Sequence, residues 1–388
     1  MKFGVLKEIK EGEFRVTLVP SDAATLIQDG HQVYIQSGAG EAAGFPNKLY
    51  EEVGCTILAN MEEMYKTCDF LAKVKEIEAV EYPLIRENQI IYCCIHPASH
   101  PEEVDALLKS KCIAITAEDS HRYGSLNCEA AGKQGALLGL YHMQTLQGGK
   151  GKFVSGLAGS PGINVLILGG GLVGKSALRV LEALGAWCTV MDINVGTLKN
   201  LQELYAERIN TQMSTRENIR RLLPQTDLII NSVKWPKGNT DYLITRDMLK
   251  LMEKGSVIVD IANDSPGAIE SFRETTHENP TYIEEGIVHY GVSNIPSLIS
   301  RSVSEALSGS ILQHFRNIMN LGLEEALRRD GYLRRSLTAY KGYLTHEETS
   351  AVQNKPWIQP EVILELSNKH LDPAPPATVS KSDFFIKL

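Results

Sequence analysis

The sequence is poor in the features that mark metal-binding, membrane and nucleic-acid-binding proteins. Its seven cysteines are scattered, and none forms a CxxC pair or a Cys/His cluster with the spacing of a zinc site. No uncharged apolar run reaches the roughly 18 residues that a membrane-spanning helix needs. Positive charge is scarce, because 39 Lys and Arg face 47 Asp and Glu, which gives a net charge of −8. We therefore expect no bound metal, no membrane span and no nucleic-acid partner.

We expect no secretory signal at the start of the chain. In MKFGVLKEIKEGEFRV, lysine and glutamate interrupt the first apolar run, whereas a signal peptide has an uninterrupted apolar stretch. An odd number of cysteines without an export signal is typical of reduced thiols. We therefore expect a cytoplasmic protein without a disulfide framework.

The length and the hydrophobic pattern predict two α/β domains. At roughly 100–200 residues per domain, the 388 residues correspond to about two. Short β-branched or aromatic runs alternate with helical patterns, which is typical of mostly parallel sheets. Two long helical patterns, 128–146 and 302–329, are natural crossovers between the domains. The expected strands are 3–6, 32–36, 56–58, 70–74, 90–94, 112–116, 164–168, 187–192, 227–232, 256–261 and 286–292.

A glycine-rich turn in the second half of the chain has the pattern of a dinucleotide-binding site. The apolar run NVLIL leads into GGGLVG (169–174) and then into a helical pattern. Gly169 permits the tight turn, Gly171 lets a pyrophosphate approach the backbone, and Gly174 allows close helix–strand packing. The next strand ends at Asp192, 18 residues after Gly174. A carboxylate there can accept both ribose hydroxyls of NAD and repel the 2′-phosphate of NADP, so we expect NAD as the cofactor.

Later strand ends should lie near the same cofactor, because ligands collect at the carboxyl ends of the strands in a doubly wound sheet. One of these strand ends is followed by Asp264, which we expect at the ligand-binding edge. The alternative is that Asp264 caps a helix, since DSPGAIE has the pattern of a helix start. The other predicted cofactor contacts flank these motifs and strand ends: Cys128, Leu172, Val173, Ile193, Ser214, Ser232, Val233 and Asn294.

Short motifs spread from Met1 to about Tyr343 resemble, in order, those of the alanine dehydrogenase/nicotinamide-nucleotide transhydrogenase family. They include GVLKEIKEGEFRVTLVP (4–20), AKVKE (72–76), IHPASHPE (95–102), ILGGGLVG (167–174), MDIN (191–194) and KGSVIVDIANDSPGAIE (254–270). The resemblance implies two Rossmann-like doubly wound domains with a cleft between them. A cofactor domain (128–301) would be inserted into a discontinuous catalytic domain (1–127 and 302–388).

The resemblance also implies oxidative deamination, in which an amino acid and NAD give a 2-oxo acid, ammonia and NADH. Arg15 matches the family's arginine that holds the substrate carboxylate, and Lys75 matches the lysine that contacts the carboxylate or carbonyl. His96 matches the general acid/base, and Asp264 matches the acid that helps to activate water and ammonia. A guanidinium grips carboxylates bidentately, an ammonium stabilises a developing alkoxide, and an imidazole exchanges protons near neutral pH.

Several positions depart from the family's pattern and bear on the substrate. Cys94 stands where the family has an aromatic residue, and Cys128 where it has a serine. Asn263 replaces an apolar residue beside the predicted acid, and Gln134 stands where a methionine is common. With Trp235 nearby, these polar changes predict a pocket that could hold a side chain more polar than a methyl group.

Three functions stay open on the sequence. The first is an NAD-dependent dehydrogenase of a small L-amino acid, most simply L-alanine, together with the reverse reductive amination of the 2-oxo acid. The second is a saccharopine- or opine-type reductase, which condenses an amino acid with a 2-oxo acid and reduces the imine. The third is a non-catalytic nucleotide-binding subunit, against which the retained family residues argue. The resemblance also implies a homo-oligomer, a hexamer or a dimer.

Overall fold

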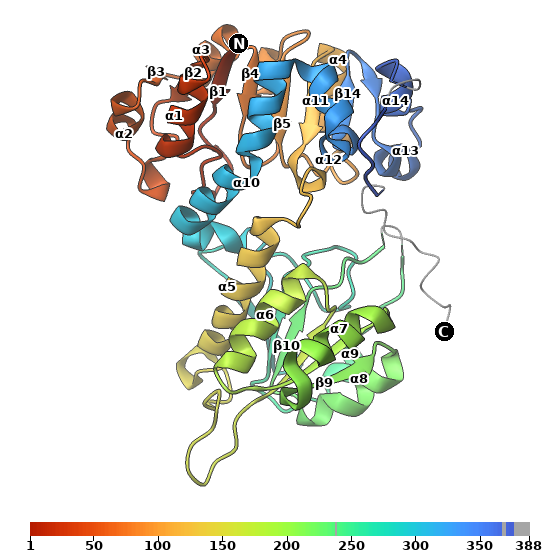
Figure 1. Ribbon diagram of the computed structural model, residues 1–388. Coiled ribbons are helices and arrows are strands. Elements are labelled where there is room, and N and C mark those ends of the chain that lie inside the picture. The colour runs from red at the N-terminus through yellow and green to blue at the C-terminus, as the bar shows by residue number, and fades with distance from the viewer. Residues whose placement is uncertain (237–238, 367–369, 376–388) are drawn as a thin grey trace. The chain divides into compact units, whose positions relative to one another are not determined.

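The chain forms two compact units in the computed structural model (Figure 1). The residues that the structure describes are 1–236, 239–366 and 370–375. The first unit contains Met1–Leu126 and the described residues from Ser297 to Pro375, and the second contains Asn127–Pro296. Both are α/β, which confirms the predicted fold class. Their assignment to substrate and cofactor stays a prediction, and the C-terminal tail, whose order the sequence leaves open, lies outside the described residues.

The first unit is built on an eight-stranded mixed sheet. Its strands are β1 (Lys2–Val5), β2 (Gln32–Gln36), β3 (Thr56–Leu58), β4 (Phe70–Ala72), β5 (Ile90–Cys93), β6 (Ile113–Thr116), β14 (Leu337–Tyr340) and β15 (Tyr343–Leu344). They lie in the order β15-β14-β6-β5-β4-β1-β2-β3, with β1 to β6 parallel and the last two antiparallel at one edge. The chain winds outward from β1 to β3 and then returns to β4 on the other side of β1. Ligands bind at the carboxyl ends of the strands at such a switch point.

Helices cover both faces of this sheet, because alternate residues along each buried strand point to opposite faces. They are α1 (Pro20–Gln28), α2 (Asn47–Glu52), α3 (Met61–Thr67), α4 (Pro101–Ser110), α10 (Ser300–Leu321), α11 (Leu323–Arg329), α12 (Gly331–Arg335), α13 (Glu347–Gln353) and α14 (Pro360–Ile363). On one face, Phe3 and Phe70 pack edge to face at 4.9 Å, and Phe315 of α10 joins them. On the other face, Leu71 and Ile91 pack with residues of α3 and α4.

The second long helical pattern proves to be two helices rather than one. The sequence predicts a continuous helix over 302–329, but α10 ends at Leu321 and α11 begins at Leu323. Gly322 between them has φ +83°, a left-handed conformation that glycine adopts without steric cost and that ends a helix. The prediction was wrong here because a single glycine within an apolar pattern is a weak stop signal.

The second unit contains a seven-stranded sheet with the same winding. Its strands are β7 (Asn164–Leu168), β8 (Trp187–Asp192), β9 (Ile209–Met213), β10 (Leu228–Asn231), β11 (Val257–Asp260), β12 (Thr281–Glu284) and β13 (Ile287–Tyr290). They lie in the order β12-β13-β11-β10-β7-β8-β9, and β12 is antiparallel to its neighbour. The winding reverses between β7 and β10, which makes their carboxyl ends the switch point of this sheet.

The helices of the second unit again pack on both faces of its sheet. They are α5 (Leu126–His142), α6 (Leu172–Ala183), α7 (Val195–Tyr205), α8 (Arg216–Leu222) and α9 (Arg246–Leu249). Close approach of α5 to α6 depends on Gly132, because a Cβ at this position would lie 2.2 Å from the carbonyl oxygen of Val173. The helix predicted over 128–146 is present as α5, although it ends four residues earlier, at His142.

Four strands were not predicted from the sequence, and all of them lie at or near the edges of the sheets. They are β9, β12, β14 and β15. An edge strand pairs on one side only and leaves side chains in solvent, so its hydrophobic alternation is weak. In β9 (INTQM), for example, only Ile209 is buried.

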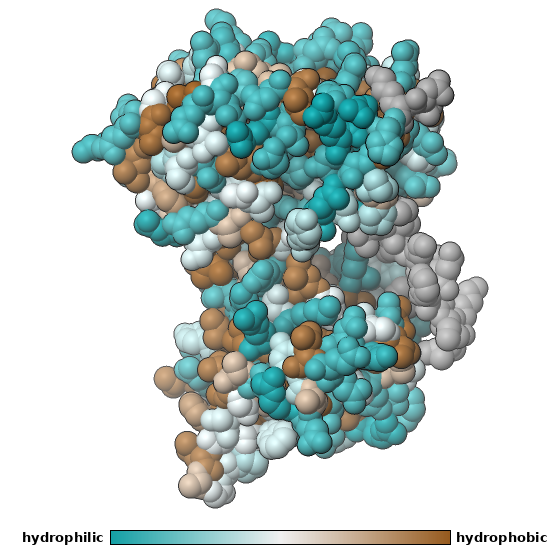
Figure 2. Space-filling model, viewed as in Figure 1, coloured by the Kyte–Doolittle hydropathy of each residue, from teal (hydrophilic) through white to brown (hydrophobic). Residues whose placement is uncertain are grey.

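The surface side shown in Figure 2 is mostly hydrophilic, with hydrophobic side chains scattered across it. The apolar side chains gather instead in four buried clusters, two in each unit and on opposite faces of each sheet. Within the described residues, no helix combines the length and the hydrophobicity needed to cross a membrane.

Candidate functional site

The glycine turn after β7 has the geometry that the sequence predicts. Gly169 has φ +90°, and a Cβ at Gly174 would lie 1.9 Å from the carbonyl oxygen of Gly169. Both positions therefore require glycine. A Cβ at Gly171 would meet nothing within 4 Å, so open space lies in front of the backbone where α6 begins. A helix N-terminus with an open approach suits a pyrophosphate, because its first amides have no partner within the helix.

Asp192 lies at the end of β8 and holds this turn. One carboxylate oxygen accepts a hydrogen bond from the amide of Gly170 at 2.7 Å, and the other accepts from the amide of Asn194 at 2.8 Å. The amide of Ser214 donates to the backbone oxygen of Asp192 at 3.0 Å. The carboxylate is thus fixed beside the glycines, where the predicted ribose would lie. This arrangement fits a nicotinamide dinucleotide.

Ser232 at the end of β10 supports the glycine turn rather than pointing away from it. Its hydroxyl donates to the backbone oxygens of Leu168 at 2.8 Å and Gly169 at 3.0 Å. The remaining predicted cofactor contacts lie at several places in or next to this unit. Leu172 and Val173 are the first two residues of α6, and Cys128 lies on α5. Ile193 follows β8 and is 45% exposed, Val233 follows Ser232, and Asn294 is buried.

Replacing Asp192 with alanine is expected to weaken NAD binding and to reduce discrimination against NADP. The variant lacks the acceptor that would bind the ribose hydroxyls and the negative charge that would repel a 2′-phosphate. Dissociation constants for NADH and NADPH measure the effect directly. Asp192→Asn is the matched control, because its amide oxygen can still accept from Gly170 while the charge is lost. An unchanged cofactor preference in both variants would mean that the ribose is recognised elsewhere.

Asp264 follows β11 in the second unit and starts no helix. The chain from 261 to 268 forms bends and loops, so the alternative in which Asp264 caps a helix is wrong. One carboxylate oxygen accepts from the amide of Trp235 at 2.9 Å, which ties the loop after β11 to the loop after β10. Asp264 therefore lies at the carboxyl edge of this sheet, although its catalytic role stays a prediction.

The structure changes the interpretation of Asn263. Its side-chain amide donates to the backbone oxygen of Gly291 at 2.8 Å, and its own backbone has φ +54°. Asparagine tolerates this left-handed conformation better than most residues. The amide thus connects the loop after β11 to the end of β13. Because its amide has this structural partner, Asn263 gives weaker support than expected to a polar substrate pocket. Trp235, the aromatic residue predicted near that pocket, is itself buried.

The other predicted catalytic residues, Lys75 and His96, and the predicted substrate-binding Arg15 lie in the first unit, at neighbouring strand ends. Arg15 is in the loop after β1, Lys75 in the loop after β4, and His96 in the loop after β5. These three strands are adjacent and parallel, and β1 and β4 flank the switch point. The charge of Lys75 affects the titration of both His96 and Glu13, the partner of Arg15. The structure thus brings Arg15, Lys75 and His96 to one edge of the sheet.

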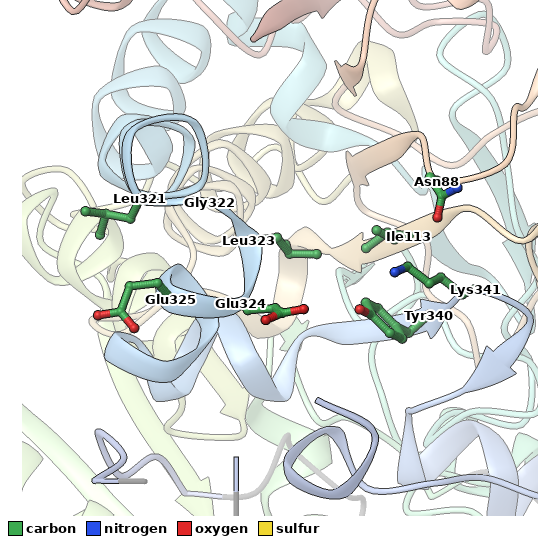
Figure 3. Close-up of a pocket in the computed structure, with 9 residues that line it drawn as sticks. All are labelled: Asn88, Ile113, Leu321, Gly322, Leu323, Glu324, Glu325, Tyr340 and Lys341. Atoms are coloured by element: carbon green, nitrogen blue, oxygen red, sulfur yellow. The ribbon is translucent and has the colours of Figure 1, made fainter. Parts of the chain in front are cut away.

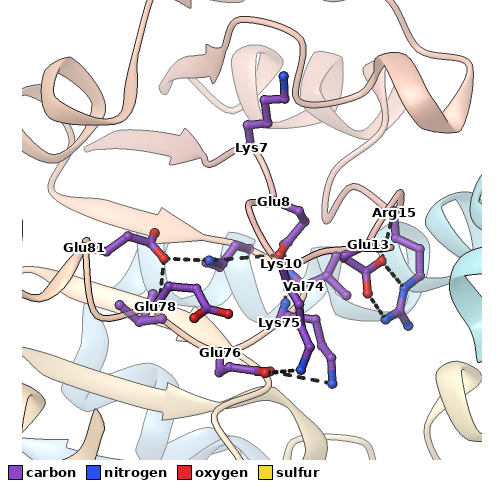
Figure 4. A network of polar contacts seen from close by, with 12 residues as sticks. Lys7, Glu8, Lys10, Glu13, Arg15, Val74, Lys75, Glu76, Glu78 and Glu81 are labelled. Atoms are coloured by element: carbon purple, nitrogen blue, oxygen red, sulfur yellow. Dashed lines mark hydrogen bonds and ion pairs between the residues drawn. The ribbon is translucent and has the colours of Figure 1, made fainter. Parts of the chain in front are cut away.

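Arg15 forms a buried ion pair with Glu13 (Figure 4). Its Nε and Nη2 atoms donate to the two carboxylate oxygens at 2.6 and 2.5 Å, and the side chains are 4% and 0% exposed. Burial alone would raise the pKa of Glu13, but the charge and the hydrogen bonds of Arg15 outweigh it and lower the pKa below its usual value. Glu13 therefore stays ionised and fixes the guanidinium plane.

Lys75 is surrounded by carboxylates that position its backbone and side chain (Figure 4). Its Nζ atom lies 3.6 Å from Glu76, which also pairs with Lys10. Its backbone amide donates to Glu8 at 3.3 Å. Burial raises the pKa of Glu76, but Lys75 and Lys10 outweigh it and lower this pKa to about 2. Burial raises the pKa of Glu8 to about 7, in spite of the opposing charge of Lys73.

His96 is held by Glu118, which follows β6. The same carboxylate oxygen accepts from the His96 amide at 2.6 Å and lies 3.3 Å from Nδ1 of the ring. Glu118 raises the pKa of His96, but desolvation and the charge of Lys75 outweigh it, so this pKa lies below its usual value of 6.5. The imidazole is therefore neutral at pH 7 and can accept a proton.

Sequence reasoning missed the four carboxylates that hold the predicted site residues. Glu76 directly follows Lys75 in the motif AKVKE. Glu8 and Glu13 lie in the same motif as Arg15, KEIKEGEFRV, and an acid two residues from an arginine is a usable signal. Glu118 follows the strand expected over 112–116, next to the strand that leads to His96. If the residues that follow this neighbouring strand had also been considered, Glu118 would have been included.

Glu103, on α4, is a buried carboxyl near this edge. Its titration predicts that the stability of the protein depends on pH. One oxygen accepts from the amide of Ile77 at 2.8 Å, while the other is buried without a hydrogen-bond partner in the described structure. Burial raises the pKa of Glu103 to about 9. A group whose folded pKa is raised contributes full stability below its unfolded pKa of 4.5, and this contribution is lost as the pH rises towards 9.

Glu103→Gln should therefore gain stability relative to the unmodified protein as the pH rises. The glutamine keeps an oxygen for Ile77 and has no proton to lose. Melting temperatures of both proteins, measured between about pH 5 and pH 9, should diverge by several degrees at the alkaline end. Glu102→Gln, at the exposed neighbouring position, is the control and should show no divergence. Parallel curves for the Glu103 variant would contradict the raised pKa.

A surface hollow of about 450 Å³ in the first unit lies away from these residues (Figure 3). Asn88 precedes β5 and Ile113 begins β6, so the hollow is at the amino ends of the strands. None of the predicted site residues lines it. Its lining residues are Asn88, Ile113, Leu321, Gly322, Leu323, Glu324, Glu325, Tyr340 and Lys341.

Two sheets of Rossmann order, one of them with an acid-bound glycine turn, place the chain among the dinucleotide-binding α/β proteins. Comparison of the sequence with known families narrows this class. The chain belongs to the alanine dehydrogenase/PNT family, because residues 4–127 match the model of its N-terminal domain and residues 135–347 match that of its C-terminal domain.

Named relatives cover most of the chain. An alanine dehydrogenase of Methanococcus maripaludis is 34% identical over 371 residues, which are 94% of this chain and 100% of the relative. Alanine dehydrogenase 2 of Staphylococcus aureus is 36% identical over 354 residues, which are 89% of this chain and 95% of the relative. A solved L-alanine dehydrogenase structure, 33% identical, covers 91% of this chain and 99% of its own with a TM-score of 0.85.

Proposed function

We propose that this protein interconverts L-alanine with pyruvate and ammonia, using NAD. Its relatives make it an amino-acid dehydrogenase, an oxidoreductase that acts on a CH–NH₂ donor. The choice of alanine within this class rests on the names of those relatives. The observation that carries the proposal is the position of Arg15, Lys75 and His96 at adjacent strand ends of one sheet.

Each of these residues has a chemical task that suits its surroundings. Arg15 binds the substrate carboxylate, and its plane is already fixed by Glu13, so little side-chain entropy is lost on binding. Lys75 stabilises the negative charge that develops on the carbinolamine oxygen as this intermediate loses its hydroxyl proton and releases the amine. Glu76, 3.6 Å from the Nζ atom of Lys75, restricts where the ammonium group can lie, and Glu8 holds the Lys75 backbone amide.

His96 moves the protons of the reaction. As a neutral imidazole it accepts a proton from the attacking water, and as imidazolium it returns one to the leaving amine. Its lowered pKa favours the neutral form as the starting state. A nicotinamide bound at the second unit would supply the hydride chemistry at the α-carbon in either direction. Asp264 assists as an acid that orients water or ammonia, and its carboxylate is held by the Trp235 amide.

The cofactor assignment rests on the second unit. The open backbone at Gly171 can receive the pyrophosphate, and Asp192 presents a carboxylate for the ribose. We propose NAD rather than NADP, since a 2′-phosphate would face the negative charge of Asp192.

A substrate screen tests this function. Enzyme and NAD with L-alanine at alkaline pH should produce NADH, and pyruvate with ammonia should consume it. The same assay with glyoxylate or 2-oxoglutarate, each with and without ammonia, tests other small substrates. NADH consumption that requires a second amino acid in place of ammonia would identify an opine-type reductase. The proposal fails if pyruvate and ammonia give no turnover while another pair does.

We also propose a homo-oligomer, a hexamer or a dimer, in the cytoplasm. Apolar side chains are exposed along α5 and in the loop that follows it, including Leu137, Leu146, Phe153 and Leu157. Exposed apolar clusters commonly mark protein contacts. All seven cysteines lie within the described residues and are free thiols, which suits a reducing compartment. Light scattering of the purified protein measures its mass, and a monomer would contradict the first part.

A further inference from the structure

We infer that the segment from His346 to Gln353 positions His96, which makes Gln353 and His346 positioning residues for the acid/base group. The inference rests on the proposed function, because it assigns a purpose to a contact on the His96 loop. The segment comprises α13 and its N-cap, and it belongs to the same unit as His96. The match to the C-terminal family model ends at residue 347, so Gln353 lies outside the matched part.

The first contact is made by Gln353, the last residue of α13. Its side-chain amide donates to the backbone oxygen of Pro97 at 2.7 Å. Pro97 directly follows His96, so this hydrogen bond fixes the Pro97–Ala98 peptide, one residue beyond the histidine. The bond joins residues 256 positions apart, and it is independent of the strand pairing that leads into the loop.

The second contact joins His346 to Asp119, the residue next to Glu118. His346 is 3% exposed, and its Nε2 atom lies 3.0 Å from the carboxylate of Asp119. Its Nδ1 atom lies 2.8 Å from the Thr349 hydroxyl and accepts from the Thr349 amide, which caps α13. Asp119 directly follows Glu118, whose carboxylate accepts the hydrogen bond from the His96 amide. One short segment therefore holds both the residue after His96 and the turn that carries its partner.

His96 needs such support because its backbone is strained. Its φ is +48°, in the left-handed region that residues with a Cβ rarely adopt. The following proline restricts the backbone further. A conformation of this kind persists only where surrounding contacts over-determine it, and such residues cluster at active sites. The loop is tied by Glu118 at the His96 amide, by Ser99 at the His96 oxygen and by Gln353 at Pro97.

The segment is itself well anchored, so it can act as a fixed support. Lys355, just beyond α13, pairs with Asp105 of α4. The amide of Ile358 donates to the oxygen of Leu344 at 2.9 Å, which closes the segment onto β15. A support of this kind matters for catalysis, because a misplacement of about 1 Å can cost on the order of 10²-fold in rate.

Gln353→Glu is the sharpest test, since it keeps the size of the side chain and removes the donor. A carboxylate oxygen would then face the Pro97 oxygen and repel it. Gln353→Ala removes the contact without repulsion, and Val352→Ala at the exposed neighbouring position is the matched control. Three quantities are measured for each: kcat and KM with pyruvate, ammonia and NADH, the melting temperature, and deuterium exchange of the peptide that spans 94–100.

Both Gln353 variants should lower kcat by about 10-fold to 100-fold, with the larger loss in Gln353→Glu. The KM for NADH and the melting temperature should match those of the control, and exchange should rise in 94–100 alone. An unchanged kcat overturns the inference even if exchange rises, because the segment would then hold the loop without positioning His96. If the unmodified enzyme turns over no tested substrate, the proposed function fails. Unchanged exchange would then still overturn the inference.

Discussion

His96→Ala should lower kcat by about 10²–10⁴, the usual loss for a general acid/base, while NADH affinity stays the same. His96 lies at the end of β5 beside the strand ends that carry Lys75 and Arg15, and its ring is held by Glu118. The glycine turn and Asp192 belong to the other unit. Removing the imidazole therefore removes proton transfer and leaves the predicted cofactor contacts unchanged.

Steady-state rates with pyruvate, ammonia and NADH, together with NADH binding followed by fluorescence, separate these two effects. His31→Ala is a suitable control, because His31 precedes β2 in the same unit and its Nε2 atom lies 2.7 Å from the side chain of Asn320 on α10, at the amino ends of the strands. The pH profile adds a second check. Since the pKa of His96 lies below 6.5, the acidic limb of kcat/KM should have its midpoint below that value. Full turnover in the His96 variant would remove this residue from the mechanism.

Glu13→Ala should lower the free energy of unfolding by about 3–5 kcal/mol. The change leaves the Arg15 guanidinium buried without the carboxylate that compensates its charge. For a unit of this size the melting temperature should fall by roughly 6–20 °C. Glu52→Ala, which breaks the exposed pair with Lys48, should change stability by less than about 0.5 kcal/mol.

A double variant separates stability from function. Glu13→Leu combined with Arg15→Met replaces the ion pair by apolar side chains of similar size, which often restores or exceeds the original stability. It should recover most of the loss seen in Glu13→Ala, and yet show no detectable turnover, because the carboxylate-binding group is gone. Thermal unfolding and turnover are measured on the same preparations. A double variant that stays active would show that Arg15 does not bind the substrate.

Much of the fold could be predicted because its signals are local. The strand–glycine–helix–strand series from Asn164 to Asp192 lies where the sequence predicts it, since each step depends on neighbouring residues. Edge strands such as β9 could not be predicted, because half of their side chains lie in solvent and the alternation fades. The alternative in which Asp264 starts a helix rests on a local capping signal. It fails because Asp264 accepts from the Trp235 amide and the backbone oxygen of Ala268 accepts from the amides of Leu243 and Ile244, in the loop after β10.

The sequence by itself determined the two α/β domains, the glycine turn with Asp192, and the positions of Arg15, Lys75 and His96 at strand ends. The domains and the glycine turn follow from hydrophobic period and from residue types at fixed short spacing, whereas Arg15, Lys75 and His96 were singled out by the resemblance of their motifs to those of a known family. Only the tertiary structure decided which partners hold them: Glu118 for His96, Asp192 for Gly170, and Gln353 for Pro97. These partners lie 22 to 256 positions apart, and such pairings depend on how strands cross over, which no local spacing records.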